Sequence, residues 1–173
     1  MKPSLCFRFF VLSLALATPV LAEPIENRLI DAPGFASDVK QSLILREQRR
    51  LTEEQFVAMA NDPNTIVLDA RSANRYEQLH IKGARSLPFT EFTAQALAEI
   101  IPSKETRVLI YCNNNVANSP IAFASKLPSA SLNLSTFTAL YTYGYRNVYE
   151  LGPLIDPTKT AIPFDGALEQ AAR

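Results

Sequence analysis

The chain has 173 residues, with 17 basic and 17 acidic side chains and no formal net charge. This length suffices for one domain with a hydrophobic core, and 47% hydrophobic against 20% charged residues excludes a disordered chain. The neutral balance gives no electrostatic reason to expect nucleic acid or an anionic membrane as a partner, and two cysteines with one histidine are too few soft ligands for a structural zinc site.

Residues 1–22 have the layout of a secretory signal peptide. Lys2 and Arg8 form a positive start, residues 9–21 are an uncharged apolar run, and Val20-Leu21-Ala22 offers a small-residue cleavage site. The apolar run is shorter than the roughly 20 residues that span a bilayer, so we expect cleavage rather than an uncleaved anchor. The mature protein would then be periplasmic or secreted, without stable membrane insertion.

We expect residues 23–50 to form a leader and a helix. Residues 23–37 include Pro33 and Gly34 and show no clear period, which is typical of a linker. Residues 38–50 have a helical pattern, with an acidic residue at the start and three arginines near the end, an order that the helix dipole favours.

Residues 51–156 predict helices that alternate with short strands, and residues 157–173 are expected as a C-terminal tail. The expected helices are 52–59, opened by a capping box, 73–79, 91–101, capped by Thr90, and 135–143, ended by Gly144. The expected strands are 65–68, 85–87, 107–111 and 147–151. Short apolar strands separated by helices indicate an α/β sandwich around a mainly parallel sheet.

Cys112 directly follows the apolar strand 107–111. Ligands of open α/β sheets bind at the carboxyl ends of the strands, so a cysteine here stands where chemistry is expected. Asn113, Asn114 and Asn115 tolerate unusual backbone angles, and a loop that turns its amides inward can stabilise a thiolate and hold an anion. On these residues alone, a catalytic cysteine and a buried structural cysteine beside an Asn-rich turn are equally open.

The order of several short motifs adds a family context. Asp69-Ala70-Arg71 closes one strand, His80-Ile81-Lys82-Gly83-Ala84 follows, Tyr111-Cys112 ends the next strand, and Gly144-Tyr145 precedes the last. In this combination, residues 51–156 resemble a single rhodanese-like domain. The resemblance implies a three-layer sandwich with a mainly parallel five-stranded sheet. It also implies a sulfurtransferase whose cysteine accepts a sulfane sulfur as a persulfide and passes it to a thiol acceptor, with no metal and no organic cofactor.

On this resemblance Cys112 is the expected nucleophile, and the backbone amides of the following loop would stabilise its thiolate and persulfide. The loop residues are Asn113, Asn114, Asn115, Val116 and Ala117. The sulfur donor would be a small molecule or a protein persulfide. In supporting positions, Asp69 and Arg71 are expected to form a structural ion pair or to orient nearby loops rather than to contact the substrate. His80 is expected to be a hydrogen-bonded structural residue rather than a general base or a metal ligand.

The loop departs from typical active rhodaneses in two respects. It lacks the glycine and the basic residue that they carry within the six residues starting at the cysteine, and the next cation along the chain is Lys126. Because a guanidinium fork is the usual clamp for an oxyanion, we expect poor activity with thiosulfate. The span from Cys112 to Gly144 is also long, which predicts an insertion at 118–133. That insertion would be either a lid or docking surface, or a plain surface loop.

Three other functions compete with sulfur transfer. A rhodanese-fold interaction module without turnover would bind a partner near 118–133. A Cys-loop phosphatase needs an arginine to close its phosphate loop, where this chain has Ala117 and Asn118. A thioredoxin-like oxidoreductase needs a second cysteine to resolve a mixed disulfide. Sulfur transfer and the interaction module therefore remain as the two functional hypotheses.

Overall fold

The computed structural model describes residue 25 and residues 27–168. The expected signal peptide, residues 1–22, lies outside the described residues. The described residues up to Ile30 belong to a separate unit, and the folded unit begins at Asp31. Within the described part of the chain, no helix is both long enough and apolar enough to cross a membrane.

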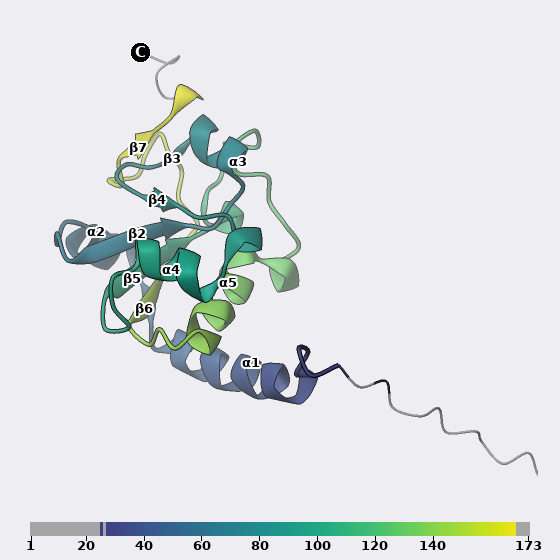
Figure 1. Ribbon diagram of the computed structural model, residues 1–173. Helices are drawn as coiled ribbons and strands as arrows, with labels where there is room; N and C mark the ends of the chain where they lie inside the picture. The colour runs from purple at the N-terminus through teal and green to yellow at the C-terminus, as the bar shows by residue number, and fades with distance from the viewer. Residues whose placement is uncertain (1–24, 26, 169–173) are drawn as a thin grey trace, which may run out of the picture. The chain divides into compact units, whose positions relative to one another are not determined.

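A five-stranded sheet forms the centre of the folded unit (Figure 1). Its strand order is β1-β6-β5-β2-β4, and every neighbouring pair is parallel. The strands are β1 (Arg50–Leu51), β2 (Thr65–Asp69), β4 (Arg85–Ser86), β5 (Arg107–Tyr111) and β6 (Val148–Leu151). This arrangement confirms the expected α/β class and the five-stranded parallel sheet, with β5 as its middle strand.

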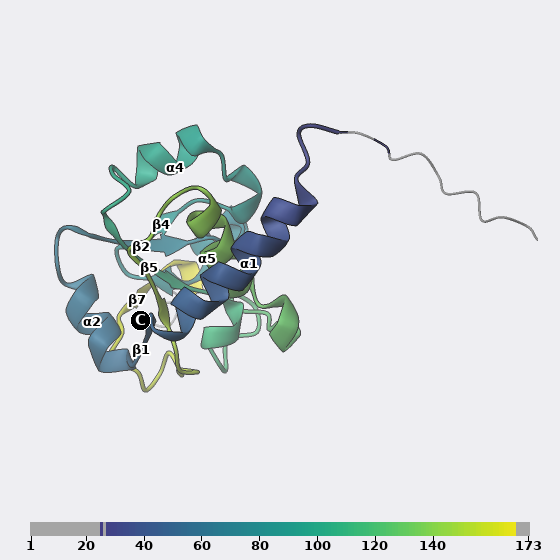
Figure 2. The ribbon, with the colours of Figure 1, turned by 90° about the horizontal axis from the view of Figure 1, so that it is seen from below.

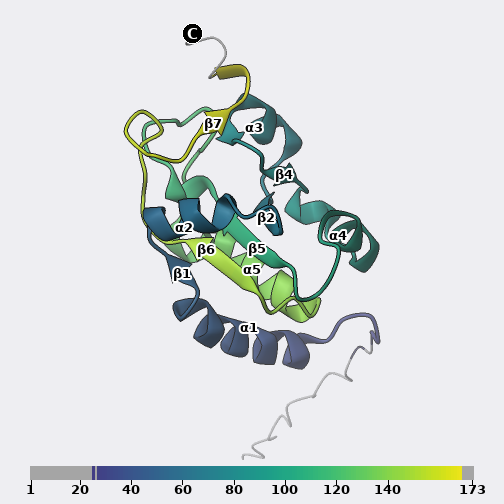
Figure 3. The same cartoon turned by 90° about the vertical axis from the view of Figure 1, so that its left-hand side faces the viewer.

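Helices cover both faces of the sheet. They are α1 (Ala32–Glu47), α2 (Glu53–Ala60), α3 (Ala73–Gln78), α4 (Ala94–Ile100) and α5 (Leu132–Thr142). Figure 3 shows α2 on one side of the sheet and α1 on the other. Helix α1 lies along α5 (Figure 2), where the Ser42 and Thr138 hydroxyls are 2.9 Å apart in a buried hydrogen bond.

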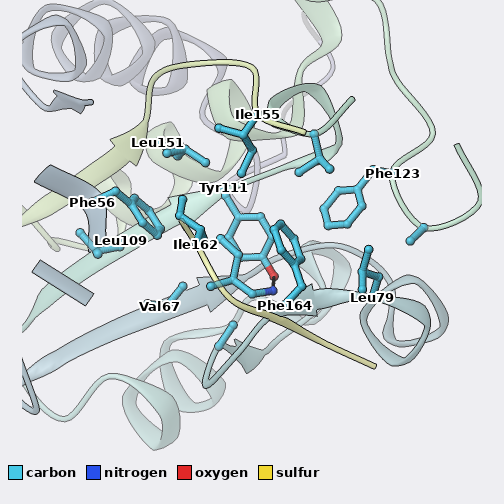
Figure 4. Packing of buried hydrophobic residues seen from close by; sticks show 14 of the residues in the cluster. Phe56, Val67, Leu79, Leu109, Tyr111, Phe123, Leu151, Ile155, Ile162 and Phe164 are labelled. Atoms are coloured by element: carbon cyan, nitrogen blue, oxygen red, sulfur yellow. Dashed lines mark hydrogen bonds between the residues drawn. The ribbon is translucent and has the colours of Figure 1, made fainter. Parts of the chain in front are cut away.

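The two central strands are buried on both faces, which explains their unbroken apolar sequence. On one face Val67, Leu109 and Tyr111 join Phe56 of α2 in one hydrophobic cluster (Figure 4). On the opposite face a second cluster surrounds Leu68. Its other buried members include Leu97 from α4, Val108 and Ile110 from β5, and Phe137 and Leu140 from α5.

Three of the predicted helices begin at other residues than expected, and side-chain caps account for two of these shifts. Helix α1 starts at Ala32 instead of 38, because the Asp31 side chain accepts a hydrogen bond from the Gly34 amide and a proline in the first turn needs no amide partner. Helix α4 starts at Ala94, capped by the Thr93 hydroxyl rather than by Thr90. Residues 89–91 form a separate 3-10 turn, and α5 begins at Leu132 instead of 135.

The expected C-terminal tail packs against the folded core as far as Gly166. Strand β7 (Phe164–Asp165) pairs antiparallel with β3 (His80–Ile81), and Ile162 and Phe164 are buried beside Tyr111 (Figure 4). Gly166 follows with φ 132°, and a Cβ there would lie 2.7 Å from the Gln78 carbonyl oxygen. This close approach of two backbones requires glycine.

Candidate active site

Cys112 lies at the carboxyl end of β5, the middle strand of the sheet, and is 1% exposed. The chain then turns at once into a single 3-10 turn, Asn113–Asn115, which Cys112 caps. In parallel sheets this end of the strands is where ligands bind. The fold therefore places the one cysteine of the described residues at the position that the sequence predicts for chemistry.

Two polar groups contact the sulfur of Cys112. The backbone amide of Asn114 donates to Sγ at 3.4 Å, and the hydroxyl oxygen of Ser131 lies 3.3 Å from Sγ. Ser131 comes from the far end of the segment between the turn and α5, so that segment covers the cysteine. Both groups can donate a hydrogen bond to the sulfur.

Asn115 fixes the turn through its side chain. Its Oδ1 accepts hydrogen bonds from the Cys112 amide at 2.9 Å and from Asn133 Nδ2 at 3.0 Å, and its Nδ2 donates to the Leu151 carbonyl at 2.7 Å. One buried amide thus joins β5, β6 and α5 around the cysteine. In the described part of the chain, the non-glycine residue with positive φ is Asn118, at 57°. Asn114 and Asn115 therefore serve through side-chain hydrogen bonds, and none of the three loop asparagines has the left-handed backbone that we expected.

The rest of the loop runs away from the sulfur. Val116 is buried and forms a parallel bridge with Ile155, and the Ala117 amide donates to the Ile155 carbonyl at 2.8 Å. The expectation that all amides from Asn113 to Ala117 face the sulfur is therefore wrong. The Ala117 amide takes part in the backbone pairing with Ile155 and does not face the Cys112 sulfur.

The predicted insertion, residues 118–133, is anchored to the domain at three points. Ala122 and Phe123 are buried in the core, and Ser131 contacts the cysteine. Between them, the side chain of Asn114 makes two hydrogen bonds to the backbone of Lys126, donating to its carbonyl at 2.8 Å and accepting from its amide at 3.1 Å. The segment is therefore a fixed cover over the Cys112 turn rather than a plain surface loop.

We expect Asn114→Ala to expose Cys112. The substitution removes both side-chain hydrogen bonds to Lys126 but keeps the Asn114 amide that contacts the sulfur. Each neutral hydrogen bond contributes about 1 kcal/mol, so the loss of both should make opening of the cover roughly thirtyfold more frequent, and alkylation of Cys112 should accelerate accordingly. The measurement is the alkylation rate of the native protein. Asn147→Ala, which loses one exposed hydrogen bond to the Glu105 carbonyl, is the matched control; equal rates in both variants would show that Asn114 does not hold the cover.

A buried ion pair supports the site from β2. The Arg71 guanidinium donates to both oxygens of Asp69, at 2.9 Å from Nε to Oδ1 and 2.6 Å from Nη2 to Oδ2. Its remaining donors reach the Ala122 carbonyl at 2.9 Å and the Leu79 carbonyl at 2.8 Å. The Tyr111 hydroxyl donates to Asp69 as well. The expected ion pair is thus present, and it ties the covering segment to β2 and β5.

Burial, together with the negative charge of Asp69, raises the pKa of the Tyr111 hydroxyl well above its ordinary value. In the unfolded chain a tyrosine ionises near pH 10, so above that pH the unfolded state gains stability that the folded state does not. The folded protein should therefore lose stability as pH rises beyond about 10. We expect Tyr111→Phe to flatten this part of the profile, measured by urea unfolding between pH 9 and 11; an unchanged slope would contradict the assignment. Tyr141→Phe, which loses a surface hydrogen bond to Gln41, is the control.

His80 is hydrogen-bonded, as its surroundings in the sequence suggested. It lies in β3, its Nδ1 is 2.7 Å from the Tyr76 carbonyl oxygen, and its ring stacks on that of Tyr76 with centroids 3.7 Å apart. In the described residues, no group of three or more histidine, cysteine or acidic side chains could hold a metal ion.

A cavity of about 400 Å³ lies beside the Cys112 turn. Asn113, which follows the cysteine, and Leu132, which follows Ser131, both line it. Arg71, Arg75 and Lys126 also line it, and they come from β2–α3 and from the covering segment. Sequence analysis did not identify this grouping, because Arg75 and Lys126 are 51 positions apart.

Residues 52–152 match the family of rhodanese-like domains. The chain belongs to this family. A curated relative, a tRNA uridine(34) hydroxylase from Cronobacter sakazakii, is 27% identical over 111 residues, which are 62% of this chain and 28% of that protein. The rhodanese-like chain thus spans less than a third of that relative.

Two solved structures share the rhodanese-like fold at low sequence identity. The BH2092 protein from Bacillus halodurans has a TM-score of 0.51 and 21% identity, covering 77% of this chain and 88% of that one. A variant of EanB in complex with hercynine has a TM-score of 0.53 and 22% identity, covering 70% of this chain and 28% of that one. At these identities the likeness concerns the fold.

Proposed function

We propose that this rhodanese-like protein is a sulfurtransferase in which Cys112 carries a sulfane sulfur as a persulfide. The observation that supports this proposal most is the placement of the thiol. Its sulfur lies at the carboxyl end of the middle strand, between the Asn114 amide and the Ser131 hydroxyl, and beside a cavity. A structural core cysteine would have no need of two polar partners.

The proposed reaction has two balanced steps. The Cys112 thiolate attacks the sulfane sulfur of the donor, a new S–S bond forms, and the bond to the donor breaks with its electron pair leaving on the donor. A thiolate acceptor then attacks the outer sulfur of the persulfide, and the Cys112 thiolate leaves. The sulfur changes partners without any outside oxidant or reductant. Hydrogen bonds from Asn114 and Ser131 favour the anionic sulfur that begins and ends the cycle.

Sulfur transfer also requires access to the thiol. Cys112 is 1% exposed, so the covering segment has to move before a donor can reach Sγ. The hydrogen bonds between Asn114 and Lys126 are on the exposed side, so the part of the segment around Lys126 can open while Ala122 and Phe123 stay buried in the core. The cover then excludes water from the persulfide once it has formed.

The test is the intact mass of the mature protein after incubation with several sulfane-sulfur donors, among them polysulfide and thiosulfate. A sulfur carrier gains the mass of one sulfur atom and loses it again on addition of a thiol. No gain from any donor would contradict sulfur transfer.

The alternative proposal is a rhodanese-fold interaction module without turnover. The covered thiol and the exposed apolar side chains of Ile121 and Leu127, on the covering segment, favour it. Such a module would leave Cys112 free of added sulfur. The similarity to the hydroxylase does not support hydroxylation by this chain, because the similar region is 28% of the length of that protein.

We propose further that the protein is exported to the periplasm or the extracellular space, on the strength of the charged start and short apolar run of residues 1–22. N-terminal sequencing of protein recovered from the cell envelope or the medium should begin at Glu23. A chain that still begins at Met1 and stays in the membrane would overturn this proposal.

A further inference from the structure

The segments that lead into three adjacent strands form a basic cavity at the amino end of the sheet. Its volume is about 350 Å³, and its charged lining residues are Arg49 before β1, Lys104 and Glu105 before β5, and Arg146 before β6. The three strands are neighbours in the sheet, in the order β1-β6-β5. Cys112 follows the other end of β5, so the 5 residues of that strand, or roughly 16 Å, separate the cavity from the thiol.

This cavity has an excess of positive charge. Within the described residues, Arg49, Lys104 and Arg146 make no ion pair, and the Glu105 carboxylate makes none either. Three cations and one carboxylate give the cavity a local charge of +2, although the whole chain has equal numbers of basic and acidic side chains. The neutral total therefore conceals an uneven distribution of charge.

Tyrosine rings, rather than carboxylates, hold these cations. The Lys104 ammonium lies 3.6 Å from the centroid of the Tyr145 ring, and the Arg146 guanidinium lies 3.6 Å from that of Tyr141. A ring attracts a cation through its quadrupole, which neither neutralises the charge nor occupies most of the N–H donors. The positions of the two side chains are thus restricted, while their charges stay available to a ligand.

Helix capping accounts for one of the three cations but not for their grouping. Arg146 also donates to the Tyr141 carbonyl in the last turn of α5, where the helix dipole favours a positive charge. Within the described residues, the Lys104 side chain makes no hydrogen bond to a helix carbonyl and lies on a ring instead. The Arg49 guanidinium lies 4.6 Å from the centroid of the Tyr149 ring and donates to its hydroxyl.

We propose that this cavity binds a phosphoryl group at a site separate from Cys112. The charge of a phosphate dianion matches the local charge of the cavity, and its oxygens can accept hydrogen bonds from an ammonium and two guanidinium groups at once. A carboxylate has fewer oxygens and half the charge. A phosphoryl group can be presented by a soluble phosphate ester or by a phospholipid headgroup. The proposal does not depend on sulfur transfer, because the cavity lies at the opposite end of β5 from the thiol.

Binding is measured by NMR shift titration of the mature protein with inorganic phosphate and with acetate, at pH 8 and constant ionic strength. We expect saturable shifts of the amides of residues 49, 104–105 and 144–147, with an affinity for phosphate about tenfold above that for acetate. Lys104→Gln and Arg146→Gln should each weaken phosphate binding by roughly three- to tenfold, as the loss of a partly exposed charged contact does. Lys40→Gln removes an exposed lysine of α1 that also makes no ion pair, and it should leave the affinity unchanged.

The source of the phosphoryl group is tested by co-sedimentation with phosphatidylcholine vesicles that contain or lack phosphatidic acid. Vesicle binding that requires phosphatidic acid and is weakened in both cavity variants, Lys104→Gln and Arg146→Gln, would support a phospholipid headgroup. Saturable binding of phosphate without vesicle binding would support a soluble phosphate ester.

Three results would overturn the phosphoryl site. They are the absence of saturable shifts at these amides, equal affinities for phosphate and acetate, and cavity variants that bind phosphate as tightly as Lys40→Gln does. Sulfur loading of Cys112 is measured in the same variants and should equal that of the wild type. The phosphoryl site and the sulfurtransferase function can therefore fail independently, and reduced loading in the cavity variants would contradict the separation of the two sites.

Discussion

Arg71→Met should destabilise the protein by roughly 3–5 kcal/mol, the cost of leaving one partner of a buried ion pair alone. Arg71 and Asp69 have side chains 1% and 0% exposed, so water cannot replace the lost guanidinium. The substitution also leaves the carbonyls of Ala122 and Leu79 without a donor. Methionine fills much of the arginine's volume, which separates the charge effect from a cavity effect. The measurement is the free energy of unfolding in urea.

Arg107→Met is the matched control for this substitution. Arg107 pairs with Asp62 at 3.0 Å, but the two side chains are 34% and 37% exposed. Solvent screens this pair, so its loss should cost less than about 1 kcal/mol. If Arg71→Met does not fold, Arg71→Lys is the second variant, because it keeps the positive charge but not the planar guanidinium. Its free energy of unfolding should lie between those of the wild type and Arg71→Met. Equal costs for Arg71→Met and Arg107→Met would contradict the supporting role of the buried pair.

Cys112→Ser should abolish sulfur loading from every donor, because a serine hydroxyl forms no persulfide. The two side chains are close in size, and the Asn114 amide and Ser131 hydroxyl can bond to an oxygen as they do to sulfur. Stability should therefore change by less than about 1 kcal/mol. Intact mass and urea unfolding measure the two effects. Mass gain in Cys112→Ser would place the carried sulfur elsewhere on the chain.

Ser131→Ala provides the graded comparison for Cys112→Ser. It removes one hydrogen-bond partner of the sulfur and keeps the thiol, so loading should persist at a rate lower by roughly two- to tenfold, the value of one hydrogen bond. A rate equal to that of wild type would show that the Ser131 hydroxyl serves the cover and not the thiolate.

The parallel sheet could be predicted from the sequence because strands buried on both faces have unbroken apolar runs. Residues 65–68 and 107–111 have such runs, and the strands lie there. The edge strand β1 and the pairing of β7 with β3 have only two residues per strand, which is too short for a period to show. Their positions depend on long-range pairing, which local patterns do not record.

The cysteine and its supporting ion pair could also be predicted, because both stand next to buried strands. The contacts of the Cys112 sulfur could not be predicted in this way. Ser131 lies 19 positions after Cys112, and its approach depends on how the whole covering segment folds back. Arg75 and Lys126 likewise share a cavity only because α3 and that segment meet above the sheet. Loop asparagines indicated a tight turn correctly, but their side-chain partners are set by the tertiary structure.

The pairing of β3 with β7 also constrains the order in which the protein folds. Strand β3 cannot pair until residues 164–165 have been synthesised. Until that point Tyr111 also lacks two of its buried neighbours, Ile162 and Phe164. A chain that emerges from the ribosome N-terminus first therefore exposes part of one hydrophobic cluster until almost all of it has been made. Folding of this domain is completed late and as a whole, so a chain cut short before residue 162 should expose apolar surface around Tyr111 and aggregate.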